Sequence, residues 1–382
     1  MISAMNNMIN RLFWTVCSTF IFVVTVTSCG SSVYELERKA MPEMEAALDS
    51  YVAEASEISL PIDAVVVLQH GKVVGERYMN GWQRDSSHHM WSTSKSYTAL
   101  AIGFALKEGL LSLDDRVCTY FPEYYDKYID GSEQGEYVAS GTIRDYLVMA
   151  TGQTEDPTWK GIISMNEKHP EVIMDDNLRC LGAYYEAAER NLIEDLFLVP
   201  FTTAPGTQNC YNSFATYVLS AIVQKVTGEK TVDYLENRLW KPLGMNKPEW
   251  FEINGVSAGG WGLMLNAEEM AKTGQMLLDN GKYAGKQVVP ADYLAEAVSP
   301  YFAWDPPTYA SLEEQPSYHQ GYGYQFWLNG DGYNTAGAQG QFIIVLPKWD
   351  AVIVGIADIK DDDHKEMALM WKYIVPVLKQ AI

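Results

Sequence analysis

Residues 92–109 read STSKSYTALAIGFALKEG, a serine and a lysine three positions apart that lead into a long apolar segment. The segment Ser96–Glu108 is apolar almost all round, which is typical of a buried helix, and Gly109 is a residue type at which helices end. Because residues i and i+3 lie on one face of a helix, Lys95 is brought beside Ser92. The pattern predicts a serine–lysine pair at the N-terminal end of a buried helix.

This pair has the features of an activated nucleophile. Unpaired N–H groups and the positive end of the helix dipole favour the alkoxide that Ser92 would form. A buried lysine would have a lowered pKa and could accept the serine proton. An S-x-x-K pattern alone usually marks a capping serine and a surface lysine. Here the aromatic residue before it and the apolar helix after it favour the catalytic interpretation.

A tyrosine opens a second apolar segment, Phe214–Val226, which ends at Gly228. The residues before it, 205–213, read PGTQNCYNS. A tyrosine at the start of a helix usually belongs to a core or an interface. Beside a serine–lysine pair, Tyr211 is a candidate general base that relays a proton between nucleophile and leaving group.

A glycine-containing stretch, TAGAQGQF over residues 335–342, lies on or just before a predicted strand. Glycines in a strand let a substrate backbone approach closely. An N–H group of this stretch could pair with that of Ser92 to form an oxyanion hole. Taken alone, the stretch would be a strand with loose turns.

Predicted strands lie near both ends of the chain and predicted helices lie between them. The economical arrangement is an α/β sandwich, in which one antiparallel sheet is built from both termini, helices flank it and a mostly helical region is inserted. The expected hairpin spans 62–79, and the expected late strands are 323–328, 341–346 and 352–357. Further helices are expected from Tyr34 onward and over 142–149, 266–278 and 365–378.

Together these motifs resemble the serine β-lactamase and penicillin-binding-protein superfamily, closest to its branch of class C β-lactamases, esterases and aminohexanoate-dimer hydrolases. The resemblance runs from about Ile62 to the C-terminus and includes residues 108–115, 142–152, 240–245, 259–263 and 321–324. It implies a β-lactamase/transpeptidase-like fold. The implied roles are acylated nucleophile for Ser92, base and acid for Lys95 and Tyr211, oxyanion-hole N–H groups for Ser92 and Ala338, and substrate contacts for Gln153, Ser213, Gly337 and Gln339.

Two departures from this family bear on the substrate. The second motif usually reads Tyr-x-Asn, and here its third position is Ser213. The third motif usually carries Lys-Thr-Gly or His-x-Gly, and the matching Thr335-Ala336-Gly337 has no charge to hold a carboxylate. We therefore expect a serine hydrolase that cleaves an ester or amide through an acyl-enzyme. A β-lactamase, a D-alanyl peptidase and a non-catalytic penicillin-binding-like envelope receptor remain alternatives.

The N-terminus has the pattern of an export signal. Arg11 is the only charged residue before position 35, and an apolar stretch over 12–26 ends in Val26-Thr27-Ser28-Cys29. Small residues before a cysteine resemble a bacterial lipobox, which implies a signal peptide over 1–28 and lipidation of Cys29. A plain secretory signal or an uncleaved anchor is the alternative. We expect a tether and first helix over 29–55, the hydrolase domain over 56–382, and a lipid-anchored protein of the cell envelope.

The amino-acid composition indicates which classes of partner and cofactor to expect. The net charge is −21 and no Lys/Arg run is visible, so we expect a small-molecule substrate and no nucleic-acid partner. With no CxxC or His/Cys cluster, we expect no metal and no organic cofactor. Cys180 and Cys210 are a candidate disulfide that the sequence leaves open. His88 and His89 are interpreted as loop residues, and the aromatic stretch 159–185 as either packing or an active-site flap.

Overall fold

The computed structural model describes residues 35–158, 160–162, 178, 181–182, 185, 190–308, 319–360, 362 and 364–380. The larger of two compact units, Leu36–Ile382, contains every described residue except Glu35. Within the described residues no helix is both long and apolar enough to span a membrane. The segment expected to be a signal peptide, with Cys29, lies outside them.

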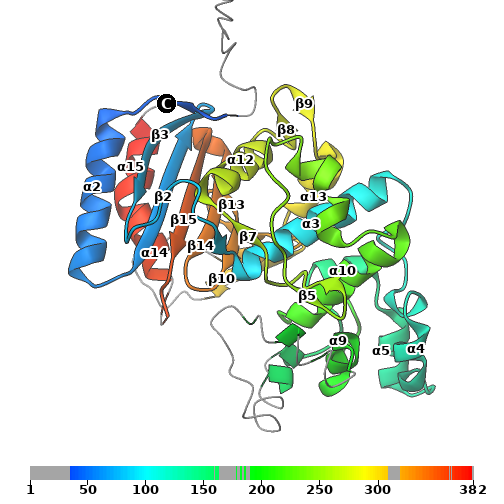
Figure 1. Cartoon of the computed structure of the whole chain (residues 1–382). Coiled ribbons are helices and arrows are strands. Elements are labelled where there is room, and N and C mark those ends of the chain that lie inside the picture. Colours follow the sequence, from blue (N-terminus) through cyan, green and yellow to red (C-terminus); the bar gives the residue numbers. More distant parts are fainter. Residues whose placement is uncertain are drawn as a thin grey trace, which may run out of the picture. The chain divides into compact units, whose positions relative to one another are not determined.

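A sheet of nine described strands forms one side of this unit (Figure 1). Its order is β1-β3-β2-β15-β14-β13-β12-β11-β10, and every neighbouring pair is antiparallel except β1 with β3. The early strands β2 and β3 therefore lie beside the last one, as expected for a sheet built from both termini. The strands span Glu37–Arg38 (β1), Ile62–Gln69 (β2), Lys72–Tyr78 (β3), Phe302–Thr308 (β10), His319–Tyr322 (β11), Trp327–Asn329 (β12), Gly332–Gly337 (β13), Gln341–Leu346 (β14) and Ala351–Ala357 (β15).

The centre of the sheet is covered on both faces, and β2, β14 and β15 are accordingly buried along their whole length and mostly apolar. Alternate residues of β2 face opposite layers. Val65 and Val67 pack with the terminal helices α2 (Pro42–Glu57), α14 (His364–Leu369) and α15 (Val375–Gln380), whereas Val66 and Leu68 join the core shared with α12 (Ala267–Leu278). Figure 1 shows α2 and α15 on one side of the sheet and α12 on the other.

The inserted region is mostly helical, and the candidate catalytic residues lie on or directly before two of its helices. These helices, α3 (Ser94–Lys107) and α10 (Ser213–Thr227), are buried and pack against each other. The Asn212 side chain accepts from the N–H of Ala215 and so fixes where α10 begins, and Gly228 ends it at φ 75°. The other helices are α4 (Pro122–Tyr125), α5 (Glu133–Ser140), α6 (Ile143–Leu147), α9 (Leu192–Asp195), α11 (Thr231–Tyr234) and α13 (Ala291–Ala297).

Short elements complete the fold. Three two-stranded ribbons pair β4 (His88–His89) with β7 (Met264–Leu265), β5 (Glu252–Ile253) with β6 (Val256–Ser257), and β8 (Lys282–Tyr283) with β9 (Lys286–Gln287). The short 3₁₀ turns are η1 (Trp91–Thr93), η2 (Val117–Thr119), η3 (Asp126–Tyr128), η4 (Leu196–Leu198) and η6 (Pro347–Trp349), and η5 (Glu236–Trp240) and η7 (Met370–Ile374) are π-helical.

Three expectations about local structure were wrong. The first described helix begins at Pro42, a residue suited to the first turn of a helix, and residues 35–41, which were expected to be helical, are not. The segment 323–328 is not one strand, because the Gly323 N–H donates to the Phe326 carbonyl and turns the chain between β11 and β12. His88 and His89 are not loop residues but form β4.

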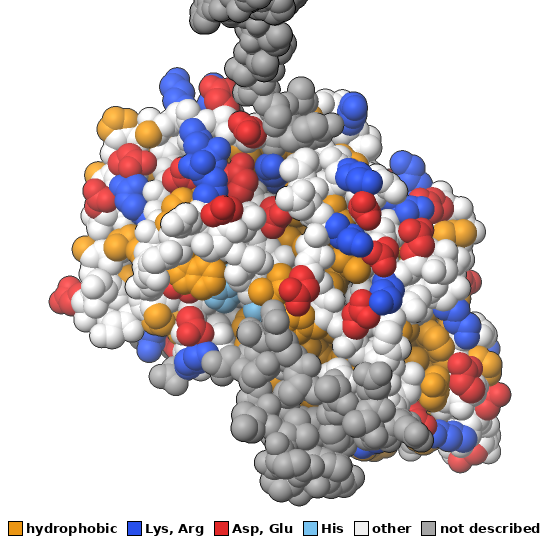
Figure 2. Space-filling model, in the orientation of Figure 1, with side chains coloured by type: hydrophobic (Ala, Val, Ile, Leu, Met, Phe, Trp, Pro, Cys, Tyr) orange, Lys and Arg blue, Asp and Glu red, His pale blue; other side chains and the backbone are white. Residues whose placement is uncertain are grey.

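On the face drawn in Figure 2, basic and acidic side chains are interspersed and no extended basic patch is visible.

Candidate active site

Ser92 lies in the 3₁₀ turn η1, directly before α3. It is half-buried, and the residue before it, Trp91, has the left-handed φ of 46° that non-glycine residues seldom adopt. The Trp91 indole N–H donates to Gln339 Oε1 over 3.2 Å. The backbone bend at the nucleophile is therefore tied to the turn between β13 and β14.

Lys95 stands one helical turn after Ser92, as the i, i+3 spacing predicts. Its Nζ lies 2.8 Å from Ser92 Oγ and also donates to the Gly260 carbonyl over 2.8 Å. The side chain is only 1% exposed. Burial lowers the pKa of Lys95 to about 7, although the negative charge of Asp156 acts in the opposite direction. A large fraction of the amine is thus neutral near pH 7 and able to take a proton.

The Tyr211 ring lies against the same ammonium, with Lys95 Nζ 4.8 Å from the ring centroid. The ring also stacks on Trp327 of β12, with centroids 5.7 Å apart and planes 22° apart. Tyr322 of β11 contacts it edge-on at 6.4 Å. Because Asn212 fixes the start of α10, Tyr211 sits just outside that helix, between Lys95 and the sheet.

The end of β13 presses against the chain that leads to the nucleophile. A Cβ added at Gly337 would lie 2.2 Å from the Met90 carbonyl oxygen, so only glycine fits there. Ala338 and Gln339 follow in the turn to β14, and Gln339 has φ 69°. The segment expected to form the oxyanion hole is thus linked to the residue before Ser92 by the Trp91–Gln339 hydrogen bond.

Thr335, which occupies the position of the family's usual cation, points into the core. It is 1% exposed, its Oγ1 lies 3.2 Å from Thr93 Oγ1, and it accepts from the N–H of Ile343. Two cations between Ser92 and Tyr211 in the sequence could replace the missing charge, but both are in ion pairs: Lys160 with Glu155 at 2.5 Å, and Arg190 with Asp195.

Two expected substrate contacts have other partners in the structure. Gln153 is 1% exposed; its amide oxygen accepts from Asn212, and its amide nitrogen donates to the carbonyls of Leu196 and Val199. This amide holds the start of α10 to the 196–199 segment and does not face an opening. Ser213 is half-buried, and its N–H donates to Thr158 Oγ1 over 3.0 Å.

Sequence reasoning gave no role to two groups that act on Lys95, one by a hydrogen bond and one by its charge. One is the Gly260 carbonyl, in a turn where a Cβ at Gly260 would lie 2.9 Å from the Ser213 carbonyl oxygen. The dense glycines of residues 259–262 were a signal for such close approach. The other is Asp156, whose Oδ1 accepts from the Thr158 N–H. Burial raises the pKa of Asp156, while the Thr158 hydrogen bonds and the Lys95 charge lower it.

Some predictions fall partly or wholly outside the described residues. Cys210 has a free thiol, and burial raises its pKa to about 11, whereas Cys180 is not described. Much of the expected flap, Trp159 included, is likewise outside them. Among the residues that are described, no group of three or more His, Cys, Asp or Glu side chains could hold a metal ion.

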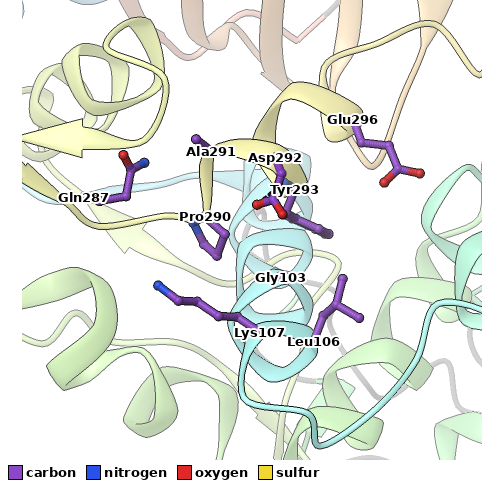
Figure 3. Close-up of a pocket in the computed structure, with 9 residues that line it drawn as sticks. All are labelled: Gly103, Leu106, Lys107, Gln287, Pro290, Ala291, Asp292, Tyr293 and Glu296. Atoms are coloured by element: carbon purple, nitrogen blue, oxygen red, sulfur yellow. Dashed lines mark hydrogen bonds between the residues drawn. The ribbon is translucent and has the colours of Figure 1, made fainter.

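A cavity of about 490 Å³ opens against the far end of α3 (Figure 3). Gly103, Leu106 and Lys107 line it from α3, and Tyr293 lines it from α13. The Tyr293 hydroxyl donates to the Ala99 carbonyl over 2.6 Å, and its ring would lie 2.4 Å from a Cβ at Gly103. This cavity lies more than two turns along the helix from Ser92, so its lining supports α3 and contributes no group to the reaction.

Comparisons with known proteins agree with this arrangement. Residues 48–370 match the Beta-lactamase family model. The 6-aminohexanoate-dimer hydrolase of Paenarthrobacter ureafaciens is 25% identical over 313 residues, 79% of this chain and 74% of that protein. The lovastatin esterase of Penicillium rubens is 22% identical over 220 residues, 56% of this chain and 53% of that protein.

Solved structures share the fold. A Bacillus anthracis protein assigned as a 6-aminohexanoate-dimer hydrolase has a TM-score of 0.68 at 20% identity, over 91% of this chain and 88% of that one. The octameric penicillin-binding protein homologue from Pyrococcus abyssi has a TM-score of 0.63 at 18% identity, over 87% and 77%. The expected β-lactamase/transpeptidase-like fold is thereby confirmed, and the chain belongs to the β-lactamase family, whose members are hydrolases.

Proposed function

We propose that the protein is a serine hydrolase that cleaves a neutral ester or amide through an acyl-enzyme on Ser92. The observation that carries this proposal is the pair of Ser92 and a buried Lys95, with Oγ and Nζ 2.8 Å apart and the pKa of the lysine lowered to about 7. Such an amine beside a hydroxyl is the arrangement that activates a serine nucleophile.

In the first half of the reaction Ser92 Oγ attacks the substrate carbonyl carbon while its proton passes to Lys95 or Tyr211. Charge then develops on the carbonyl oxygen, and we assign its stabilisation to the N–H groups of Ser92 and Ala338. As the bond to the leaving group breaks, Tyr211 gives that group a proton. The acyl group remains on Ser92 as an ester.

The second half reverses this relay. Water attacks the acyl carbon, its proton passes to the same basic groups, and Ser92 recovers its proton as the acid product leaves. These steps need only a nucleophile, a base and an oxyanion hole, so the chain's own side chains and N–H groups suffice for the chemistry.

The charge of the site supports neutral substrates over those with a free carboxylate. Thr335 offers a buried hydroxyl in place of a cation, Lys160 and Arg190 are in ion pairs, and Asp156 adds a carboxylate near Lys95. A charge-assisted hydrogen bond to a carboxylate is worth about 1.5–3 kcal/mol, which is roughly a ten- to hundredfold difference in binding. A β-lactamase or D-alanyl peptidase would need that bond.

We expect kcat/KM to be about ten- to a hundredfold higher for a substrate whose carboxylate beside the scissile bond is capped as a methyl ester or amide than for the free acid. The measurement is steady-state kinetics on such matched pairs. Lys160→Ala is the control and should leave the ratio unchanged. Preference for the free acid, lost in Lys160→Ala or Arg190→Gln, would show that one of these cations serves the substrate and would favour the penicillin-recognising alternative.

We also propose that the mature protein is held at the cell envelope by a lipid on Cys29, a proposal that rests on the Val26-Thr27-Ser28-Cys29 pattern. The full chain should partition into the detergent phase, and Cys29→Ala should move the exported form into the aqueous phase. Mass spectrometry of the mature N-terminus is the decisive measurement. An unlipidated N-terminus at a residue other than Cys29 would refute this proposal.

A further inference from the structure

His89 is a buried histidine, 3% exposed, that no step of the proposed reaction uses. It lies in β4, which pairs with β7, three residues before the nucleophile. Its ring stacks on Phe251, with centroids 5.3 Å apart and planes 6° apart, and lies 4.5 Å from the ring of Trp91. The ring therefore packs against the residue that bends the backbone at Ser92.

His89 also binds the backbone of a distant turn. Its Nε2 accepts from the N–H of Gly262 over 3.0 Å. A ring nitrogen that accepts a hydrogen bond carries no proton, so this atom presents a lone pair to the turn. Gly262 has φ 88°, and a Cβ there would lie 2.7 Å from Phe251 Cβ. The N–H donor thus belongs to a residue that only glycine can occupy.

The same turn carries the acceptor for the catalytic lysine. The carbonyl of Gly260, two residues before Gly262, accepts from Lys95 Nζ over 2.8 Å. The carbonyl of Gly259 accepts from Thr98 Oγ1 over 3.0 Å. His89 therefore holds the turn at Gly262, next to the bonds from Phe251 and Trp250, and α3 holds it through Lys95, Thr98 and Ser94, whose Oγ accepts from the Leu263 N–H.

We propose that His89 is a positioning residue for Lys95, acting through its hydrogen bond to Gly262, which holds the Gly260 carbonyl against the lysine. The proposal rests on the proposed function of Ser92 and Lys95. Without the Nε2 acceptor, the Gly262 N–H loses its partner. The turn then keeps the bonds that the Gly262 and Trp261 carbonyls accept from the Phe251 N–H and the Trp250 indole, but the Gly260 carbonyl is less firmly held against Lys95. Water would then reach the ammonium group.

The consequence for Lys95 is a change in acidity. Burial is the main cause of its low pKa, so hydration of the amine raises that pKa toward its ordinary value. The titratable groups that face Lys95 are Ser92 from its own turn, Tyr211 from the start of α10 and Asp156 from the 151–158 segment. Because an aromatic replacement at His89 keeps the ring contact with Trp91 beside Ser92, the acid limb of the pH–rate profile of such a variant reports on the turn.

Two substitutions separate the hydrogen bond from the packing of the ring. His89→Phe keeps an aromatic ring against Phe251 and Trp91 but removes the acceptor. His89→Gln places an amide oxygen near the position of Nε2 but removes the ring. We expect His89→Phe to lower kcat/KM at pH 7 about tenfold and to move the acid limb up by about one pH unit, with KM little changed. His89→Gln should stay close to the wild type.

The matched control is His88→Phe, the same change one residue earlier. The His88 ring contacts the carbonyl of its neighbour, the ring of Trp82 and the Asp63 carboxylate, which lies 3.8 Å from its Nε2. These contacts do not involve the 259–262 turn, so this variant should keep the wild-type profile. The opposite ranking, with His89→Phe active and His89→Gln impaired, would assign His89 to packing alone and overturn the proposal. So would a His89→Phe profile that overlays the wild type.

If His89→Phe does not fold, Phe251→Leu serves in its place, because it removes the stacked ring and leaves the Nε2 acceptor intact. This variant should keep the acid limb where the wild type has it, and a shift there would overturn the proposal. Labelling of wild-type Ser92 by a fluorophosphonate distinguishes failure of the proposed function from failure of the proposed role of His89. An unlabelled wild type contradicts the proposed function, whereas a labelled and active wild type with an unshifted His89→Phe contradicts only the role of His89.

Discussion

Replacing Ser92 by alanine should lower kcat at least about a thousandfold and abolish labelling by a fluorophosphonate, because the other groups of the site cannot be acylated in its place. The change removes one half-buried hydroxyl oxygen, whose bond to Lys95 is a polar contact at the edge of the core. The fold should therefore persist. Turnover of a short-chain nitrophenyl ester, mass spectrometry of the labelled protein and a thermal unfolding curve measure the three quantities.

The control for this prediction is Ser87→Ala, an exposed serine five residues before the nucleophile, which should keep full activity and labelling. A folded Ser92→Ala protein with wild-type turnover would contradict the assignment of Ser92 as the nucleophile. Wild-type protein that is neither labelled nor active on esters, nitrocefin or D-amino-acid amides would favour the non-catalytic receptor.

The second large effect is expected for replacement of Lys95, which should lower the activity and raise the stability of the protein. Lys95→Met should lower kcat/KM at least about a hundredfold, the usual contribution of a positioned general base. It should also raise the free energy of unfolding at pH 7 by on the order of 2–4 kcal/mol, because a buried amine is replaced by an apolar side chain of similar length. Activity and stability would then trade against each other at one residue.

The pH dependence of both quantities follows from the pKa of Lys95, which burial lowers from its ordinary 10.5 to about 7. The proposed reaction uses the neutral amine, so kcat/KM should rise with pH through about 7. Between these two values the unfolded chain binds more protons than the folded one, so wild-type stability should rise with pH there. Below pH 7 both states are charged and the full cost of burial is present.

Lys95→Met should lack this part of the slope, and its stability advantage should shrink as the pH rises from 7 to 10. Urea unfolding of both proteins at several pH values provides the measurement. Parallel stability curves would mean that the amine is hydrated in the folded protein and that its pKa is not lowered by burial.

Local patterns in the sequence predicted the parts of this structure that local chemistry decides. The apolar periodicity of 96–108 and 214–226 gave helices α3 and α10 to within two residues, and the i, i+3 spacing placed Lys95 against Ser92. The buried strands β14 and β15 were also located, because each contains a run of apolar residues. The role of the residues around Tyr211 and Gly337 came from family resemblance added to these patterns.

The remaining parts depend on contacts between residues far apart in the chain, which periodicity does not report. His89 was interpreted as a loop residue because nothing near it signals a strand, yet it pairs with Met264 and binds Gly262. Gln153 was expected to touch substrate, but its amide is used to hold Asn212. The 323–328 stretch carries strand-forming residues, but the Gly323–Phe326 turn divides it.

The place of β15 in the sheet has a consequence for biosynthesis. Residues of β2 pair with β15, which follows it by about 280 residues and joins it to β14. A ribosome adding about 5–20 residues per second needs roughly 15 to 60 s to make that interval. During this time the apolar edge of β2 has no partner strand, and such an edge invites pairing with other chains. The nascent chain therefore carries an unpaired strand edge until Ala357 has emerged, and a ribosome that stalls before Ala351 would release a product that lacks the strand joining β2 to β14.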